Sequence, residues 1–257
     1  MAMIQNISLE FSNVSEEAVS LKDKRIVILG GSSGLGFATA KAAADEGALV
    51  VIASNSQVQI QQAQEKLPSS AEGHVINLLD ESSIKSCFEK IGAYDHLVYT
   101  AGDPLRAVNQ KDMSFEEAQR FFGVRYWGAF LATKYGAGKI REGGSIVLTS
   151  GMTSQRPLKS MSVVSSVCGA VEALARALSV ELAPLRVNVV CPGTVKTELW
   201  NTFPEAAREA IFQSAEQSLL VKHAGEPHEV AEAYLYLMRG GFTTGQVVVA
   251  DGGLAVG

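Results

Sequence analysis

Seven short apolar runs recur along this chain, and a helical pattern follows each of the first six. The runs are rich in β-branched residues and are apolar throughout, which is typical of parallel strands covered on both faces. We predict these strands at residues 25–29, 49–53, 73–78, 95–99, 145–149, 186–190 and 246–250. Strands that alternate with helices in this way predict an α/β fold built on one parallel sheet.

The helical patterns are long enough to connect neighbouring parallel strands. They are predicted at residues 34–47, 82–91, 114–137, 160–183 and 227–238, with a further Gln-rich helix that ends before Pro68. Residues 197–220 read as a polar stretch. Because no repeat or linker divides the chain, we expect a polar N-terminal leader over residues 1–20 and one domain over residues 21–257. That domain is predicted to be a single doubly wound Rossmann domain with a seven-stranded parallel sheet.

The composition limits the classes of function. Hydrophobic residues make up 47% of the 257 residues, which is too many for a disordered chain. The formal charge of −5 provides no basic field for a phosphate backbone, so nucleic acid is not an expected partner. Three cysteines without a CxxC pair, together with four histidines, predict neither a disulfide framework nor a metal site.

The sequence also gives expectations about the compartment. We find no apolar run that approaches the roughly 20 residues of a membrane span, so no membrane partner is expected. The N-terminal region contains Glu10, Glu16 and Glu17, which is wrong for a signal or transit peptide. With cysteines that fit reduced thiols, these features predict a cytoplasmic protein.

The first predicted strand runs into a glycine-rich turn. Residues 30–36 read Gly-Gly-Ser-Ser-Gly-Leu-Gly and open the first predicted helix. Glycines let the backbone approach a pyrophosphate closely, and the free N–H groups at a helix N-terminus favour an anion. A strand, a glycine turn and a helix in this order predict a dinucleotide-binding site.

The spacing G-x-x-x-G-x-G resembles that of the short-chain dehydrogenase/reductase family, and further landmarks follow in the family's order. Residues 99–102, Tyr-Thr-Ala-Gly, resemble its N-N-A-G motif. Residues 186–197 resemble its R-V-N-x-x-x-P-G-x-x-x-T motif, and residues 251–253 resemble its closing D-G-G. The resemblance spans about residues 21–253 and implies an oxidoreductase that uses a nicotinamide dinucleotide.

The resemblance also implies which residues bind the cofactor. It places the glycine turn at the pyrophosphate, residues 101–102 under the cofactor and residues 192–197 on the nicotinamide side. The full set comprises Gly30, Ser32, Ser33, Gly34, Leu35, Gly36, Ser54, Asn55, Ser56, Asn77, Leu78, Thr100, Ala101, Gly102, Pro192, Gly193, Thr194, Val195 and Thr197.

The end of the second predicted strand bears on the choice of dinucleotide. An NAD site places an acidic side chain there for the ribose hydroxyls, whereas this chain has Ser54, Asn55 and Ser56. Three polar groups without a carboxylate favour NADP(H). Asn77 stands where the family usually has Asp and can hydrogen-bond the adenine amino group.

The family's reaction uses a tyrosine that passes a proton, a lysine four residues later, a serine about thirteen residues upstream and a helical asparagine. Aligned on the family's Y-S-A-S-K-A-A-x-E-A-L, the tyrosine position holds Val164 and the lysine position holds Cys168. The serine position holds Gly151, and the asparagine position holds Arg125. By this alignment the chain is a divergent member that lacks the Ser-Tyr-Lys-Asn tetrad.

The candidates that remain for catalysis are Arg125 and Ser150. A guanidinium facing a pocket is costly unless it binds substrate or pairs with a carboxylate such as Asp103, and both alternatives stay open. Ser150 precedes the vacant serine position, although strand alternation points it the other way. The expected substrate pocket comprises Asp103, Gly151, Arg156, Val164, Cys168 and Trp200.

Val164 and Cys168 lie four residues apart on one helix face, so they should present an apolar wall where the family has its proton donor. Tyr135 and Lys139 fit the spacing Y-x-x-x-K, but they end the helix before the fifth strand and have glycines between them. We therefore expect an ordinary helix C-terminus there instead of a catalytic pair.

Three functions fit a retained cofactor site with an altered catalytic set. The first is an NADP(H)-dependent reductase of an iminium or similar activated small molecule, because an iminium that accepts hydride becomes a neutral amine and needs no proton. Divergent family members in fungal alkaloid pathways, some of which guide a cycloaddition, look similar in kind. The second is a catalytically silent NADP(H)-binding protein, and the third is a carbonyl reductase with a non-standard acid such as Ser150.

Family members usually assemble as tetramers through the helices after the fourth and fifth strands, so a homo-oligomer is expected.

Overall fold

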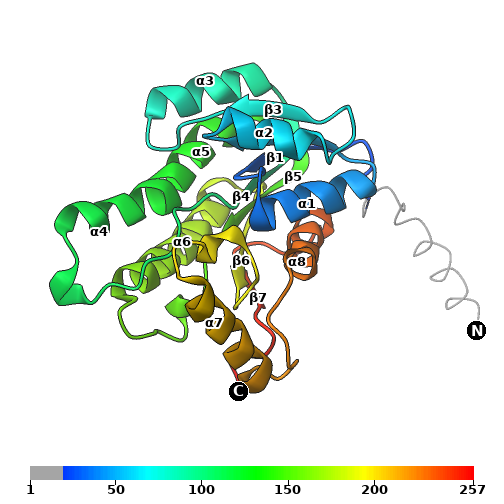
Figure 1. The fold of residues 1–257 in the computed structure, drawn as a ribbon. Helices are drawn as coiled ribbons and strands as arrows, with labels where there is room; N and C mark the ends of the chain where they lie inside the picture. The colour runs from blue at the N-terminus through cyan, green and yellow to red at the C-terminus, as the bar shows by residue number, and fades with distance from the viewer. Residues whose placement is uncertain (1–19) are drawn as a thin grey trace, which may run out of the picture.

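The computed structural model describes residues 20–257, and its strands form one seven-stranded parallel sheet (Figure 1). The strands are β1 (Arg25–Leu29), β2 (Leu49–Ser54), β3 (Glu72–Val75), β4 (Tyr94–Tyr99), β5 (Ile140–Thr149), β6 (Arg186–Pro192) and β7 (Val247–Ala250). Their order is β3-β2-β1-β4-β5-β6-β7, which confirms the doubly wound Rossmann architecture. The expected leader over residues 1–20 lies outside the described residues, except for its last residue.

Helices cover both faces of the sheet. They are α1 (Gly34–Asp45), α2 (Gln57–Gln64), α3 (Glu81–Ile91), α4 (Phe115–Phe122), α5 (Ala129–Gly136), α6 (Ser162–Glu181), α7 (Glu205–Ser218) and α8 (Pro227–Arg239). One face packs against α1, α2 and α8, and the other packs against α3, α5 and α6. In β1, Ile26 and Ile28 face the first layer while Val27 and Leu29 face the second, and all four are buried. Burial on both faces explains why the strands read as continuous apolar runs.

The helix predicted over residues 114–137 contains a π-helical segment, η4 (Gly123–Gly128), between α4 and α5. Tyr99 at the end of β4 donates a hydrogen bond from its hydroxyl to the carbonyl oxygen of Val124 in this segment. Gly128 makes room for that hydroxyl, because a Cβ there would lie 2.4 Å from its oxygen. The hydroxyl thus ties η4 to the carboxyl end of β4. π-Helical turns are frequent at functional sites, and this one contains Arg125.

Two elements differ from the prediction. The polar stretch over residues 197–220 contains α7, which buries Ala215 and, after the helix, Leu219 in a small apolar cluster against which the partly buried Phe212 packs. Few of the α7 residues are apolar, so the helical periodicity of apolar residues is weak in the sequence. β3 ends at Val75 instead of Leu78, because the Asn77 side chain accepts a hydrogen bond from a backbone N–H two residues on and turns the chain.

α6 is long and apolar enough to cross a membrane by length and composition alone, which the sequence analysis did not anticipate. Its charged residues, such as Glu172 and Arg176, break the apolar run when the sequence is read linearly. In the structure α6 packs Val171, Ala175 and Leu178 against the sheet. The core of the α/β domain therefore accounts for the apolar composition of this helix.

Candidate active site

The predicted cofactor residues lie along the carboxyl edge of the sheet. The strand order reverses between β1 and β4, and ligands of doubly wound sheets bind in the crevice at such a point. The glycine turn follows β1, residues 100–102 follow β4, and residues 150–151 follow β5. Because all seven strands are parallel, these segments meet at one edge.

The glycine turn is packed closely against itself and against the end of β4. Gly30 has a φ of +88°, in the left-handed region that favours glycine. A Cβ at Gly36 would lie 2.2 Å from the Gly30 carbonyl oxygen and 2.4 Å from the Thr100 hydroxyl oxygen. Ser33, the N-cap of α1, makes no side-chain hydrogen bond to the helix. The first N–H groups of α1 are therefore available to an anion such as a pyrophosphate.

The segment after β6 approaches the same helix N-terminus. A Cβ at Gly34 would lie 3.5 Å from the Thr197 Cβ and 3.3 Å from a carboxylate oxygen of Glu198. Gly193 packs on the backbone of Asp251, the first residue of the closing D-G-G motif. The structure thus brings together the glycine turn, the segment after β6 and the C-terminal motif, which lie far apart in the sequence.

The adenosine end of the expected site lies at the carboxyl ends of β2 and β3. Ser54 is buried, Asn55 is exposed, and Ser56 is the N-cap of α2, where its hydroxyl accepts a backbone hydrogen bond at 3.3 Å. The first turn of α2 contains no acidic residue. Leu78 is buried, and the Asn77 amide oxygen accepts a backbone hydrogen bond at 3.0 Å. A bond from an adenine amino group would have to share that oxygen.

The residues aligned with the family's catalytic positions on β5 and α6 lie side by side. A Cβ at Gly151 would be 3.3 Å from the Cys168 sulfur. Val164 and Cys168 are only 4% and 6% exposed and pack in an apolar cluster with Phe121 of α4. Thr153 donates a hydrogen bond to the Cys168 sulfur at 3.7 Å. The structure therefore places two buried, uncharged side chains at the α6 positions where the alignment expects a tyrosine and a lysine.

Arg125 is held by the backbone instead of by an acidic side chain. Its guanidinium lies against Gly102, where a Cβ would be 2.5 Å from Nη1, and its Nη2 donates to the carbonyl oxygen of Asp103. The Asp103 carboxylate lies 3.9 Å from Arg120. The sequence left open an ion pair between Arg125 and the Asp103 carboxylate. The structure of residues 20–257 contains no such pair. Arg125 Nε and Asp103 Oδ2 are both buried without a hydrogen-bond partner there.

Burial shifts the pKa values of both Arg125 and Cys168. Burial lowers the pKa of the Arg125 guanidinium, while Cys168, Asp103 and Tyr99 act in the opposite direction. Burial raises the pKa of the Cys168 thiol, and the hydrogen bond from Thr153 and the charge of Arg125 oppose that rise. Cys168 is thus a neutral thiol beside a charged guanidinium. The Arg125 Nε has no acceptor among the described residues, and a buried N–H without a partner is costly.

Ser150 is bound to a carboxylate of α6. Its hydroxyl donates to Glu172 Oε1 at 3.0 Å, and the Ser154 hydroxyl donates to the same oxygen at 2.6 Å. These bonds tie the end of β5 and the following turn to α6. The geometry gives Ser150 a structural partner, and its catalytic role stays a prediction.

Two loop residues expected near the substrate have partners within the chain. Arg156 donates from Nη1 to two carbonyl oxygens of the C-terminal segment. Trp200 donates from Nε1 to the Val195 carbonyl oxygen at 2.8 Å, and its ring lies 5.8 and 6.2 Å from the ring centroids of Phe203 and Phe212. Arg156 is therefore directed to the end of the chain, and Trp200 anchors its segment to α7.

Tyr135 and Lys139 lie at the opposite edge of the sheet. Lys139 is in the turn that immediately precedes β5, and the Tyr135 hydroxyl donates to Glu81 at 2.5 Å. The amino edge of a parallel sheet faces away from the crevice at the carboxyl edge. The geometry is that of an ordinary helix C-terminus, as the sequence analysis expects.

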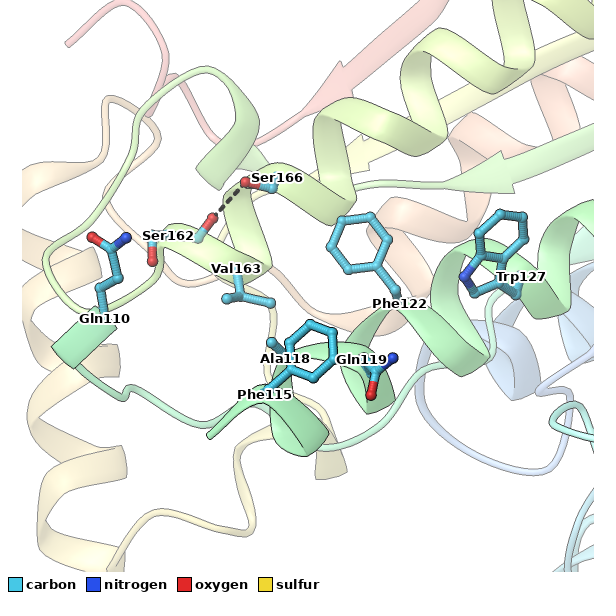
Figure 2. A pocket seen from close by; sticks show the side chains of 9 residues that line it. All are labelled: Gln110, Phe115, Ala118, Gln119, Phe122, Trp127, Ser162, Val163 and Ser166. Carbon is cyan, nitrogen blue, oxygen red and sulfur yellow. Dashed lines mark hydrogen bonds between the residues drawn. The ribbon is translucent and has the colours of Figure 1, made fainter. Parts of the chain in front are cut away.

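A cavity of about 630 Å³ lies between α4 and α6 (Figure 2), and its lining residues Phe122 and Val163 pack against the apolar cluster that contains Val164 and Cys168. Its lining contains no charged side chain and comprises Gln110, Phe115, Ala118, Gln119, Phe122, Trp127, Ser162, Val163 and Ser166. Phe115 and Trp127 are 72% and 53% exposed. Val163 and Ser166 lie on a different face of α6 from Val164 and Cys168. This cavity therefore opens on an exposed apolar surface beside the Val164 and Cys168 cluster.

The fold and the carboxyl-edge crevice define a Rossmann protein with a dinucleotide-type site, and comparisons with known proteins agree. The family model described as Enoyl-(Acyl carrier protein) reductase matches residues 30–255. Short-chain dehydrogenase/reductase ATR9 of Stachybotrys chlorohalonatus is 34% identical over 249 residues, which cover 91% of this chain and 98% of that protein. Short-chain dehydrogenase/reductase malC of Malbranchea aurantiaca is 31% identical over 252 residues, which cover 91% of this chain and 95% of that protein.

Solved structures give the same result. A small-chain dehydrogenase in complex with NADPH is 33% identical with a TM-score of 0.78, covering 92% of this chain and 100% of that one. MalC Reductase/Diels-Alderase from Malbranchea aurantiaca is 29% identical with a TM-score of 0.86, covering 93% of this chain and 98% of that one. The chain belongs to the short-chain dehydrogenase/reductase family. In the general sense of that family it is an NAD(P)H-dependent oxidoreductase.

The structure brings two acidic residues to this edge that sequence reasoning does not select. Glu172 lies four residues after Cys168 on the same face of α6, and this spacing is a signal that could have found it. Glu198 directly follows Thr197 of the family motif, but nothing in the sequence shows that its carboxylate reaches α1.

Proposed function

We propose that this chain is an NADP(H)-dependent reductase of an activated small molecule, an iminium or a similar C=N electrophile, in secondary, alkaloid-like metabolism. The observation that carries the proposal is the pair of buried, uncharged side chains Val164 and Cys168 beside the charged Arg125. An iminium carbon that accepts a hydride becomes a neutral amine, so the reaction needs no proton donor at that bond. Reduction of a ketone creates an alkoxide, which a side chain or water must protonate.

Arg125 gives this proposal a constraint on the substrate. A buried guanidinium repels an iminium unless the substrate also presents a carbonyl or carboxylate oxygen. The guanidinium of the partly exposed Arg125 suits such an oxygen, and the bond would hold the electrophile in place. We therefore expect a substrate that combines a cationic C=N bond with a nearby oxygen acceptor.

The relative named MalC Reductase/Diels-Alderase supports a wider role for the site. Its name joins a reduction to a cycloaddition in one protein of the same fold. Because the apolar cluster around Val164 can shape a hydrophobic ligand, we propose that this chain also guides a cyclisation of its reduced substrate.

NADP(H) fits the residues at the carboxyl edge. The available N–H groups of α1 suit the pyrophosphate, and when bound the cofactor supplies the hydride. Ser54, Asn55 and Ser56 offer polar groups and no carboxylate to a 2′-phosphate. The related small-chain dehydrogenase that was solved in complex with NADPH supports the same choice.

The substrate class can be tested with three matched cyclic compounds. All three carry the same ring carboxylate as the oxygen acceptor: an N-methyl-dihydroisoquinolinium has a permanently cationic C=N bond, the dihydroisoquinoline has a neutral imine, and the tetralone is the corresponding ketone. We expect NADPH consumption, followed at the absorbance of the reduced nicotinamide, to be fastest with the iminium. The rate with the iminium should stay flat with pH, because no proton is transferred, whereas the rate with the imine should fall as pH rises.

Turnover of the ketone alone would contradict the proposal and favour a carbonyl reductase with an unforeseen acid. Binding of NADPH without turnover of any compound in a wider panel of oxygen-bearing iminium ions would support a silent cofactor-binding protein.

The dinucleotide preference gives a second prediction, at Asn55. The substitution Asn55→Asp is expected to weaken NADPH binding about tenfold, because a carboxylate repels the 2′-phosphate. Binding of NADH should be unchanged or tighter, because the carboxylate can accept hydrogen bonds from the ribose hydroxyls. Dissociation constants from fluorescence titration of both cofactors measure this change.

Gln62→Glu is the matched control for that substitution. It adds the same charge on an exposed turn of α2, further along the helix. Equal losses of NADPH affinity in the two variants would mean that Asn55 does not face the 2′-phosphate.

We also propose that the chain is a cytoplasmic homo-oligomer without nucleic acid or membrane partners. The exposed Phe115 and Trp127 form part of an uncharged surface over α4 and α6 (Figure 2). Large exposed apolar patches mark interaction sites, and a second copy can cover its own equivalent surface through a two-fold axis.

A further inference from the structure

Four segments, which we call the first to fourth mouth segments, follow the carboxyl ends of β4, β5, β6 and β7: residues 103–109, 152–161, 197–218 and 251–257. These four strands are neighbours in the sheet, all on one side of the point where the strand order reverses. Gly151 directly precedes the second mouth segment, and Val164 and Cys168 lie on the helix that follows it. The mouth segments are therefore the loops on the substrate side of the crevice.

The first mouth segment is joined to the second and to the third. The Val108 N–H donates to the Ser160 carbonyl oxygen at 3.0 Å, which joins the first segment to the second. The Thr202 hydroxyl donates to the Leu105 carbonyl oxygen at 2.6 Å, which joins the third segment to the first. Leu105 also packs against the apolar cluster that contains Val164. The first mouth segment thus lies against the aligned catalytic positions.

The fourth mouth segment is folded on itself and packs on the third. The Asp251 carboxylate accepts hydrogen bonds from the N–H groups of Gly253 at 2.8 Å and Ala255 at 2.7 Å. Leu254 packs against the apolar cluster that contains Ala215 of α7. This packing leaves one gap in the chain of contacts, between the fourth mouth segment and the second.

Arg156 closes that gap. From the second mouth segment its Nη1 donates to the carbonyl oxygens of Leu254 and Gly257 in the fourth, the latter at 2.6 Å. Among the hydrogen bonds within residues 20–257, these are the only two that join the two segments. The other joins use backbone N–H groups or apolar packing, whereas this one depends on a single exposed side chain. One substitution can therefore open the ring of four segments.

We propose that Arg156 is a positioning residue that sets the size of substrate the chain accepts. By holding the fourth mouth segment to the second, it completes the ring around the substrate side, and the ring limits the substituents that fit beside the reacting atom. Without Arg156 the fourth segment moves outward, and bulkier substrates gain room. The inference rests on a substrate site at the carboxyl edge and does not depend on the C=N bond of the proposed function.

The substitution Arg156→Met tests this role, because it keeps a long stem and removes the N–H donors. The probes are the N-methyl- and N-benzyl-dihydroisoquinolinium ions that carry the ring carboxylate. We expect the unchanged protein to favour the methyl compound in kcat/KM. In Arg156→Met this preference should fall about tenfold, the lower end of what a change in a hydrophobic pocket contributes. The fall should come mainly from a lower KM for the benzyl compound. A loss of folded protein lowers kcat for both compounds equally and leaves the preference unchanged.

Two further variants serve as controls. Arg156→Lys should retain most of the preference, because an ammonium can donate to the same carbonyl oxygens. Lys159→Met removes a cation from the same mouth segment, where the exposed Lys159 side chain makes no hydrogen bond or ion pair within residues 20–257. It should leave the preference unchanged. An unchanged preference in Arg156→Met, or an equal fall in Lys159→Met, would overturn the inference.

This test survives a failure of the proposed function. If the chain reduces ketones instead, the matched pair is the methyl- and benzyl-substituted tetralone, with the same expected fall. Hydrogen exchange followed by mass spectrometry needs no turnover at all. Arg156→Met should raise exchange in residues 252–257 and also at the Val108 amide, which lies at another join of the ring. Exchange that rises only in residues 252–257 would make Arg156 a local anchor and overturn the inference.

Discussion

Replacement of Gly36 by alanine is expected to weaken NADPH binding by on the order of 100-fold, which corresponds to about 2.7 kcal/mol. The added methyl group would lie 2.2 Å from the Gly30 carbonyl oxygen and 2.4 Å from the Thr100 hydroxyl oxygen. The first atom is backbone and the Thr100 hydroxyl is held by a hydrogen bond to the Leu29 carbonyl oxygen at 3.1 Å, so the glycine turn must move away from the end of β4. The N–H groups of α1 then no longer face the pyrophosphate. Fluorescence titration with NADPH measures the loss.

The control for this substitution is Gly138→Ala, where nothing lies within 4 Å of an added Cβ. That variant should bind NADPH as the unchanged protein does. Both variants should keep the circular dichroism of the folded protein, because the Gly36 clash is local to one turn. An affinity for NADPH that Gly36→Ala leaves intact would show that the pyrophosphate does not rest on this turn.

The strands and most of the helices could be predicted because each has a local sequence signal. In β1, for example, four consecutive apolar residues are buried by helices on both faces. α7 could not be predicted in this way, because it buries only one narrow stripe and the rest of its surface is polar. The π-helical form of η4 also has no local signal, since it depends on the Tyr99 hydroxyl of a distant strand.

The cofactor side of the candidate site could be predicted by position, because parallel strands deliver their following loops to one edge. The hydrogen-bond and ion-pair partners of individual side chains could not be predicted from the sequence. Arg125 and Asp103 have opposite charges and a short separation in the fold, yet Arg125 donates to the backbone of Asp103. This choice depends on Gly102, which has no side chain to keep the guanidinium away from the backbone. Such three-residue geometry is not encoded in spacing or composition.

We propose that the residues at the four positions that differ from the family pattern in the sequence alignment depend on one another. In the family pattern the cation stands on α6, whereas in this chain Arg125 brings a cation from η4 to the neighbourhood of Cys168. Gly151 leaves just enough room for the Cys168 sulfur, with 3.3 Å to an added Cβ. A side chain of the family cannot therefore be restored singly without a conflict with the others.

This interdependence predicts that Cys168→Lys alone strongly destabilises the protein, by about 3–5 kcal/mol in free energy of unfolding. The ammonium would be buried beside the Arg125 guanidinium and in the apolar cluster that contains Val164. Cys168→Met is the matched control, because methionine has a similar length and no charge. It should cost less, on the order of 1–3 kcal/mol for overpacking. Urea unfolding measures both values.

Cys168→Lys and Cys168→Met can also be compared in a protein that carries Arg125→Asn, which isolates the effect of the Arg125 charge on the free energy of unfolding. With the guanidinium removed, the difference between lysine and methionine at position 168 should shrink by about 1–3 kcal/mol, which is the usual range for coupled neighbours. An unchanged difference would show that the two positions do not share one charge site. If the difference shrinks, Arg125 and position 168 share one charge site, as the proposed function requires.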